Sequence, residues 1–202
     1  MKTKDQLVEF FQEIEPKLVP IIETINFADW FDIEVDENKY FYDLCRTIVG
    51  QQLAGKAASA IFARFEKLFV EVTPKNVLLT APEDLRSSGL SWAKVRSVQD
   101  LADRVSSGTL ELAALKSLSD EELIIELSKV KGIGRWTAEM FLMFRLGRED
   151  IFSLGDLGLK NGLKKYLSKS ELSKEGIDEY TNRWSPYRTY GAIAMWHLLD
   201  NR

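Results

Sequence analysis

The sequence predicts an all-α fold, because signals that begin helices recur along the chain while segments typical of strands are scarce. Helix-capping residues, some with proline or glutamate in the following turn, precede apolar segments at Asp36, Thr73 with Pro74, Thr80 with Glu83, Ser91, Ser119 with Glu122, and Ser185 with Pro186. Apolar residues then recur at helical spacing at Phe41, Leu44, Cys45, Ile48 and Val49, and again at Val95, Val98, Leu101, Ala102 and Val105. We expect about ten short helices joined by short loops.

Composition is that of a globular protein with one or two compact domains. Of the 202 residues, 45% are hydrophobic and 29% are charged. No apolar run has the length that a bilayer requires, and carboxylates interrupt the N-terminal segment where a signal peptide would be apolar. We therefore expect an intracellular, cytoplasmic protein without a membrane partner.

The sequence contains few of the residues that bind metal ions or redox cofactors. Cys45 is the only cysteine, so an internal disulfide, a thiolate zinc site and a four-cysteine iron–sulfur cluster are excluded. His197 is the only histidine, and in the apolar segment AMWHLL we expect it to pack or to bond a carbonyl rather than to bind a metal. No cofactor is expected.

The chain carries a formal net charge of −4 and has a pI near 5.3, which argues against binding of nucleic acid through a general positive field. Any contact with DNA must be local. A local anion site is predicted by the segment SDEELIIELSKVKGIGRWTAEMFLMFRLG, which is typical of a helix, a tight turn and a second helix over residues 135–146.

Gly132 and Gly134 bracket that turn, and Ile133 between them can fill the angle between the helices. The amides of the glycines and of the second helix's first turn can bind an anion such as a DNA phosphate. The alternative is that the glycines only turn the chain between two packed helices.

The full pattern VKGIGRWTA at residues 130–138 resembles the helix-hairpin-helix of DNA base-excision glycosylases. The segment DIFSLGDLGLKNGLKKYL resembles their catalytic segment, with Asp156 following Gly134 by 22 residues (156 − 134). Three further segments match the 3-methyladenine DNA glycosylase II branch, and they extend the resemblance from residue 40 to residue 200: IVGQQLAGKAASAIFARF, LRSSGLSWAKVRSVQDLA and RWSPYRTYGAIAMWHL.

The resemblance implies an all-α, two-lobed helix-hairpin-helix glycosylase fold, without the N-terminal β-rich domain that some members of the branch carry. One lobe would comprise residues 34–134 and end in the hairpin, and the other would combine residues 1–33 with 135–202. The implied reaction is hydrolysis of the N-glycosidic bond of alkylated purines such as 3-methyladenine and 7-methylguanine, which leaves an abasic site. The implied partner is double-stranded DNA with alkylated bases, bound by a monomer.

Asp156 is the candidate catalytic residue. A fixed negative charge there would stabilise the sugar cation that forms as the glycosidic bond breaks, and the carboxylate can also position or activate the attacking water. The alternative is that Asp156 caps the helix LGLKNGLKKYL, and the two roles are compatible because a helix N-terminus favours an ionised carboxylate. By resemblance, Trp136 stands where bifunctional glycosylase–lyases have a lysine nucleophile and Lys131 is not its equivalent, so simple hydrolysis is expected.

Aromatic residues are candidates for binding a cationic alkylated base, because electron-rich rings attract cations. Core packing is the alternative for every one of them. By resemblance the stronger candidates are Trp136 and Trp196, and the weaker ones are Trp30, Phe31 and Tyr187. Met140 and Leu157 stand where a longer relative has tyrosines, and a pocket with fewer aromatic rings would favour 3-methyladenine and 7-methylguanine over bulkier bases.

Residues 50–53 match the loop from which this family inserts a side chain into the gap left by the flipped base. Gln52 or Leu53 is the expected wedge, with Gln51 beside it. The alternative is that GQQLAG only ends one helix and begins the next. Lys160, with Lys164 and Lys165, forms a basic face that could contact phosphates or simply be solvated.

At the hairpin itself, the expected DNA-binding residues are Lys131, Gly132, Ile133, Gly134 and Arg135. By resemblance, the hairpin carbonyls, here those of Val130 and Gly132, can hold a monovalent cation such as Na⁺ or K⁺. Two other functions remain open. One is a non-catalytic helix-hairpin-helix module that only binds DNA, and the other is a helical protein–protein scaffold, which the acidic balance alone supports.

Overall fold

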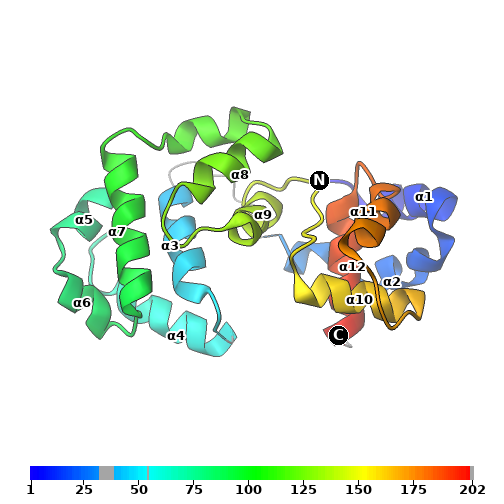
Figure 1. The fold of residues 1–202 in the computed structure, drawn as a ribbon, viewed down its shortest axis with the longest axis horizontal. Helices are drawn as coiled ribbons and strands as arrows, with labels where there is room; N and C mark the ends of the chain where they lie inside the picture. Colours follow the sequence, from blue (N-terminus) through cyan, green and yellow to red (C-terminus); the bar gives the residue numbers. More distant parts are fainter. Residues whose placement is uncertain (32–38, 54, 201–202) are drawn as a thin grey trace. The chain divides into compact units, whose positions relative to one another are not determined.

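The computed structural model describes residues 1–31, 39–53 and 55–200, and these ranges contain twelve α-helices and no strand (Figure 1). The predicted all-α class is confirmed. None of the described helices is long and apolar enough to cross a membrane.

The chain packs into two compact units. One comprises Glu34–Phe141, and the other combines Met1–Ile33 with Leu142–Arg202. The boundary between the units follows Phe141, whereas the sequence predicts that it follows Gly134. The helix after the hairpin packs into the 34–141 unit, since the Phe141 ring meets the Tyr40 ring edge-on with 5.7 Å between centroids.

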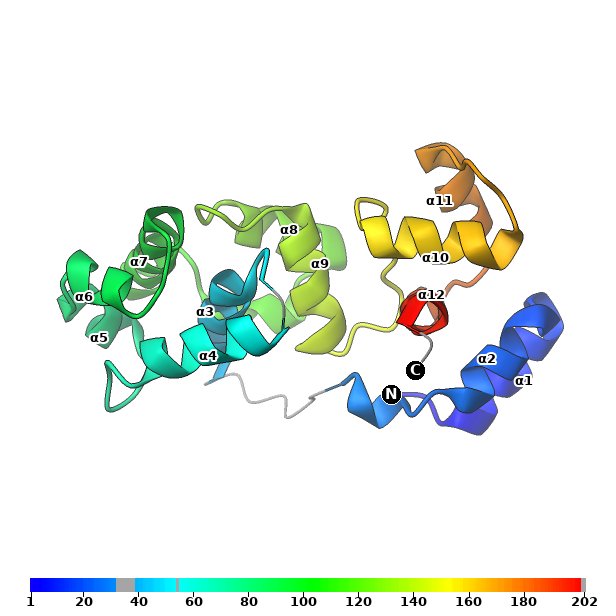
Figure 2. The same ribbon diagram turned by 90° about the horizontal axis from the view of Figure 1, so that it is seen from below.

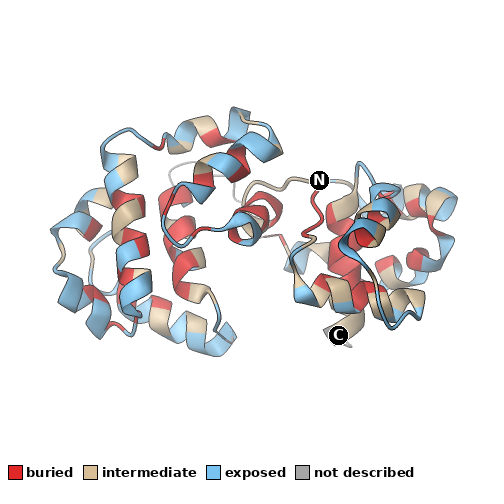
Figure 3. Ribbon diagram, in the orientation of Figure 1, coloured by how far each residue is buried: buried red, intermediate tan, exposed pale blue. Residues whose placement is uncertain are grey.

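The helices that begin in the 34–141 unit are α3 (Tyr40–Gly50), α4 (Gly55–Glu66), α5 (Pro74–Leu79), α6 (Pro82–Ser87), α7 (Trp92–Ser106), α8 (Asp120–Ser128) and α9 (Arg135–Phe144). A 3₁₀ segment, Leu112–Ser117, precedes α8. The predicted apolar faces of α3 and α7 are buried, apart from Val105, which is half-buried (Figure 3). These two helices also contact each other, so their apolar faces form the centre of this unit.

Local capping residues begin several helices as predicted. The Thr73 hydroxyl accepts the Asn76 amide at 3.2 Å, and Ser91 caps α7 through the Lys94 amide. Ser119 and Glu122 form a complete capping box at the start of α8.

Two predicted helix starts are wrong, and a third lies outside the described residues. Thr80 closes α5 by donating to the Asn76 carbonyl at 2.9 Å, and α6 begins at Pro82 without a side-chain cap. Ser185 donates to Asp150 Oδ2 at 2.8 Å, and the helix that follows begins only at Arg188. Asp36 falls in the segment that the structure does not describe.

The helices of the other unit are α1 (Lys4–Ile14), α2 (Val19–Thr24), α10 (Leu157–Leu167), α11 (Lys174–Asn182) and α12 (Arg188–Asp200). The helix α12 lies against α10 (Figure 2). Residues 192–195 of α12 are fully buried. The approach is so close that a Cβ at Gly162 of α10 would overlap the Met195 carbonyl of α12. This close contact holds the middle of α10 against α12.

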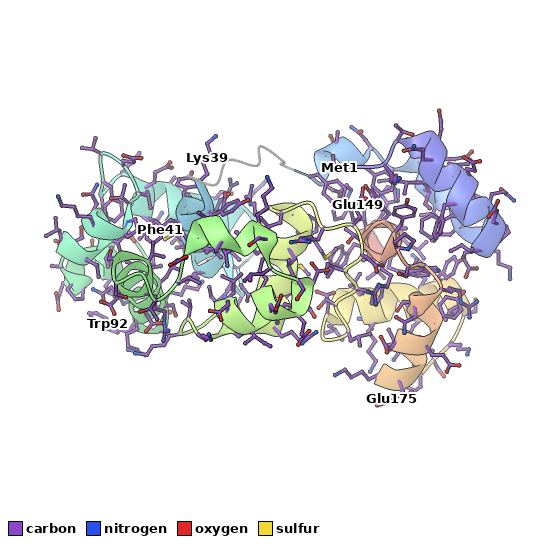
Figure 4. All side chains as sticks on the ribbon, turned by 90° about the horizontal axis from the view of Figure 1, so that it is seen from above. Met1, Lys39, Phe41, Trp92, Glu149 and Glu175 are labelled. Atoms are coloured by element: carbon purple, nitrogen blue, oxygen red, sulfur yellow. The ribbon has the colours of Figure 1, made fainter. Side chains whose placement is uncertain are left out.

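The N-terminal segment belongs to the same unit because it is tied to the residues after position 142. Lys2 donates its amide to Glu149 Oε1 at 2.9 Å, and the Tyr190 hydroxyl donates to the same oxygen at 2.6 Å. Met1 and Glu149 accordingly lie beside each other (Figure 4). Segments far apart in the sequence therefore share one core.

Candidate functional site

The turn between α8 and α9 adopts the predicted hairpin, and only one of its two glycines is required by the protein itself. Gly132 has φ +80°, and a Cβ there would overlap Ser97 Oγ of α7. Gly134 has an ordinary φ, and a Cβ there would meet no atom within 4 Å. Packing explains the first glycine, whereas the second leaves open space on the surface of the turn.

The hairpin amides divide into two groups. Lys131 donates its amide to Asp100 Oδ2 at 2.9 Å, and Ile133 donates its amide to the Val130 carbonyl at 3.1 Å. The amides of Gly132 and Gly134 have no acceptor within the described parts of the chain, so they can bind an external anion. The Ile133 side chain is 3% exposed and fills the turn, so only its backbone can reach a ligand.

The two basic side chains of the hairpin are already paired with carboxylates. Arg135 forms a bidentate bond with Glu121, at 2.9 and 2.8 Å, and a further bond with Glu139 at 3.0 Å. The Lys131 ammonium lies 3.7 Å from Asp100 Oδ1. The positive charge expected at this turn is thus largely neutralised within the protein.

Asp100 on α7 holds the hairpin turn through Lys131 and also bonds Arg104 at 2.8 Å. Burial raises the pKa of Asp100, but the hydrogen bonds from the Lys131 amide and the Arg104 guanidinium lower it more. The net pKa lies below the usual value, and the carboxylate stays ionised at neutral pH.

The loop after α3 is tied to this hairpin. Gln51 Nε2 donates to the Gly132 carbonyl at 2.8 Å and to Thr137 Oγ1 at 3.1 Å. Lys94 Nζ donates to the Val49 and Gln51 carbonyls, both at 2.7 Å, and burial lowers its pKa. Gln51 therefore faces the protein, and Lys94 is a supporting residue that the sequence did not reveal, since it lies 43 positions from Gln51.

The two wedge candidates are presented differently from Gln51. Gln52 is exposed and has φ +58°, in the left-handed region that side chains rarely adopt. Leu53 is 37% exposed. Two exposed residues, one of them with a strained backbone, lie on a loop held by Lys94, which agrees with the predicted insertion. Which of the two residues inserts stays a prediction.

The carbonyls expected to hold a monovalent cation are each engaged by a protein donor. The Gly132 carbonyl accepts Gln51 Nε2, and the Val130 carbonyl accepts the Ile133 amide. Each oxygen keeps a second lone pair, so the two could still contribute to a cation site, but they do not make one by themselves. No cluster of carboxylate, thiol or imidazole groups suited to a metal ion occurs in the described ranges.

In the other unit, Asp156 caps α10 and bonds a tryptophan. Its Oδ1 accepts the Leu159 amide at 2.7 Å and the indole Nε1 of Trp196 at 3.1 Å. Trp196 stacks on Trp30 with 6.0 Å between centroids and 8° between planes, and Phe144 packs on it at 5.9 Å. The structure thus brings together three of the predicted residues, Asp156, Trp196 and Trp30, at the N-terminus of one helix.

Other predicted residues of this unit have structural partners instead. Tyr187 packs edge-on against Phe10 at 4.8 Å and carries the Lys2 ammonium over its ring. Phe31 is 7% exposed and packs between Phe144 and Tyr190. Packing inside the unit therefore engages both rings, and a contact of either with the base stays a prediction.

The basic face of α10 is partly used inside the unit. Lys164 pairs with Glu171 at 3.2 Å, and Lys165 donates to the Leu198 carbonyl at 2.8 Å. Lys160 is half-buried. His197, the single histidine of the sequence, lies 3.2 Å from the Thr24 hydroxyl, and its expected packing role stays a prediction.

Trp136 and Met140 lie on α9, in the 34–141 unit. Trp136 is 42% exposed and Met140 is half-buried. Their role as pocket residues stays a prediction.

The all-α fold, the hairpin between α8 and α9 and the Asp156 cap of α10 agree with the predicted resemblance to helical DNA base-excision proteins. The family model of the HhH-GPD superfamily of base excision DNA repair proteins matches residues 45–186. The chain belongs to this superfamily, and the predicted resemblance is confirmed.

Two relatives with more than 30% identity are named DNA-3-methyladenine glycosylases. DNA-3-methyladenine glycosylase 1 of Schizosaccharomyces pombe is 34% identical over 168 residues, which cover 80% of this chain and 73% of the relative. The DNA-3-methyladenine glycosylase of Saccharomyces cerevisiae is 35% identical in an alignment 232 residues long, which covers 95% of this chain and 78% of the relative.

The fold is shared with solved structures, two of which are similar to this chain over most of its length. The 3-methyladenine DNA glycosylase of S. pombe in complex with abasic DNA matches with a TM-score of 0.79 and 29% identity, covering 95% of each chain. A DNA-3-methyladenine glycosidase from Bacillus halodurans matches with a TM-score of 0.79 and 33% identity, covering 94% of this chain and 87% of that one.

Proposed function

We propose that this protein is a monofunctional DNA glycosylase that flips alkylated purines, such as 3-methyladenine and 7-methylguanine, out of duplex DNA and hydrolyses their bond to the sugar. The observation that carries the proposal is the Asp156 carboxylate, fixed at the N-terminus of α10 by the Leu159 amide and the Trp196 indole. The names of the relatives support the choice of alkylated bases.

The Asp156 carboxylate would supply the negative charge that stabilises the transition state of this reaction. An alkylated purine already carries positive charge, so its bond to the sugar is weak and little acid catalysis is needed. As that bond breaks, the sugar becomes cationic, and a fixed negative charge beside it lowers the barrier. Asp156 can also orient the water that attacks the sugar.

The aromatic residues at Asp156 suit a cationic base. Trp196 and Trp30 are both half-buried, so they combine a fixed ring with some exposed surface. An electron-rich ring attracts a cationic base more than a neutral one by about 0.5 to 2 kcal/mol per good contact. This preference supports methylated purines as substrates.

The side chains at the start of α9 support hydrolysis rather than lyase chemistry. The first turn of α9 holds Arg135 and Trp136, and neither supplies a primary amine. Lys131 is held in the turn by Asp100, through both its amide and its ammonium. Without a lysine nucleophile at α9, the abasic strand should remain intact.

DNA binding would be local, as the net charge of −4 requires. The Gly132 and Gly134 amides would bind a phosphate, and Gln52 or Leu53 would fill the gap left by the flipped base. The protein would act as a monomer on genomic DNA inside the cell. A monovalent cation at the Val130 and Gly132 carbonyls remains part of the prediction.

The experiment is to incubate the purified protein with duplex DNA methylated at purines, and to measure both free bases and strand breaks. We expect release of 3-methyladenine and 7-methylguanine, with nicks appearing only after alkaline treatment. Borohydride should trap no protein–DNA adduct. Duplex binding without release of any base would instead establish the non-catalytic binding module.

A further inference from the structure

The Trp196 indole is fixed on several sides, and its N–H edge is directed at Asp156. Trp30 stacks nearly parallel to it, at 8° between planes, and Phe144 packs on it at 36°. Its donor atom, Nε1, lies 3.1 Å from Asp156 Oδ1. The ring is thus held so that its only polar atom engages the carboxylate.

Two hydrogen bonds to Asp156 converge on one of its carboxylate oxygens. Oδ1 accepts the Leu159 amide at 2.7 Å and the Trp196 indole at 3.1 Å. The amide alone would cap the helix, so the indole is not needed to satisfy α10. Two donors on one oxygen fix the rotation of the carboxylate and hence the direction of its second oxygen, Oδ2.

Gly158, in the first turn of α10, leaves the space that this bond requires. A Cβ there would lie 3.0 Å from Asp156 Oδ1 and 3.0 Å from Trp196 Nε1, the two atoms of the bond. Its φ is not positive, so backbone conformation does not require a glycine. Alanine is the better helix former, and the space beside the indole is what accounts for glycine at this position.

We propose that Trp196 is a positioning residue for the reaction, which acts through its hydrogen bond to Asp156, and that Gly158 keeps the space for that bond. This rests on the proposed function, since it assumes that Asp156 is the catalytic carboxylate. Trp196 would orient the Asp156 carboxylate whether or not its ring also contacts the base.

The test is the single-turnover rate constant for release of 7-methylguanine, measured together with affinity for a duplex that contains an abasic analogue. Trp196→Phe keeps a ring but removes the donor, and should lower the rate constant about 10- to 100-fold while changing affinity by less than about twofold. Gly158→Ala should lower it about three- to tenfold, because the indole must shift by a few tenths of an ångström.

Matched variants separate positioning from simple loss of packing. Trp184 is fully buried, and its Nε1 has no partner among the described residues, so Trp184→Phe should lower thermal stability but leave the rate constant within about twofold. Gly176→Ala, in the first turn of α11, should leave the rate constant unchanged.

A double-mutant cycle decides the mechanism. If Trp196 acts through Asp156, Trp196→Phe should cause no further loss in an Asp156→Asn protein. An equal loss in both backgrounds, or a Trp196→Phe rate within about twofold of the parent, would overturn the positioning role while leaving the glycosylase intact. Full activity of Asp156→Asn would instead remove Asp156 from the mechanism, and with it this role, whereas absence of base release by the parent would contradict the proposed function itself.

Discussion

At the scale of single residues, the hairpin turn has glycine at two positions for different physical reasons. Gly132 is required by the fold, because its φ is +80° and a side chain would overlap Ser97 Oγ. Gly134 is surrounded by open space and has an ordinary φ. A close approach by an external partner is a sufficient reason for the second glycine, and packing for the first.

Alanine substitutions should separate these two reasons. Gly132→Ala should lower the free energy of unfolding by about 1 to 3 kcal/mol, because it combines backbone strain with overlap. Gly134→Ala should change that free energy by less than about 0.5 kcal/mol but weaken binding to duplex DNA. Thermal unfolding without DNA, followed by a binding titration, measures both, and equal stability of the two variants would contradict this account.

Some residues of the site could be predicted from sequence and others could not. Asp156 stands directly before a helical segment, so its capping role is a local property. The Lys94 bond to the loop after α3 and the stack of Trp30 on Trp196 join residues that lie far apart in the chain. Such contacts depend on tertiary packing, which local patterns do not contain.

At the scale of elements, a helix start can be predicted correctly where the capping side chain has no other hydrogen-bond partner that competes with the helix amides. Ser91 and Ser119 cap their helices. The hydroxyls of Thr80 and Ser185 instead bond a preceding carbonyl and a distant carboxylate, so neither is available as a cap. A single sequence does not show which acceptor such a hydroxyl will choose.

The contact between α7 and the hairpin gives an acid-dependent prediction. The pKa of Asp100 is lower in the folded protein than its ordinary value of 3.8. Folding therefore gains stability from this group above pH 3.8, and that gain is lost as the pH falls through the lower, folded-state pKa. Asp100→Asn should reduce stability at neutral pH and flatten the fall in stability below about pH 4.

Urea unfolding between pH 2.5 and 7 measures this slope. Asp103→Asn, on the same helix with an exposed side chain, is the matched control and should keep the parental slope. A parental slope in Asp100→Asn as well would show that the ionised Asp100 does not stabilise the hairpin contact.

At the scale of the whole molecule, an acidic chain with a net charge of −4 belongs to a superfamily of DNA repair proteins. Local contacts are the proposed substitute for a general positive field. The amides of Gly132 and Gly134 have no acceptor among the described residues, while carboxylates pair the Lys131 and Arg135 side chains. The proposed phosphate contact therefore depends on backbone geometry more than on side-chain charge.

The family and the all-α class could be predicted from the sequence because both rest on local motifs. The division between the two units could not, because it depends on where the apolar face of α9 packs. Phe141 joins Tyr40 in the core of the 34–141 unit, so α9 follows the hairpin into that unit. Segments such as 1–33 join residues beyond 142 through contacts such as Lys2 with Glu149.

The central claim is that Asp156 acts in the chemical step, and the most direct measurement is the single-turnover release of 7-methylguanine by the parent and by Asp156→Asn. We predict that the substitution lowers the rate constant about 100- to 1,000-fold while affinity for an abasic-analogue duplex is retained. Asp178→Asn, on α11 of the same unit, should retain the parental rate. Parental release by Asp156→Asn would contradict the account.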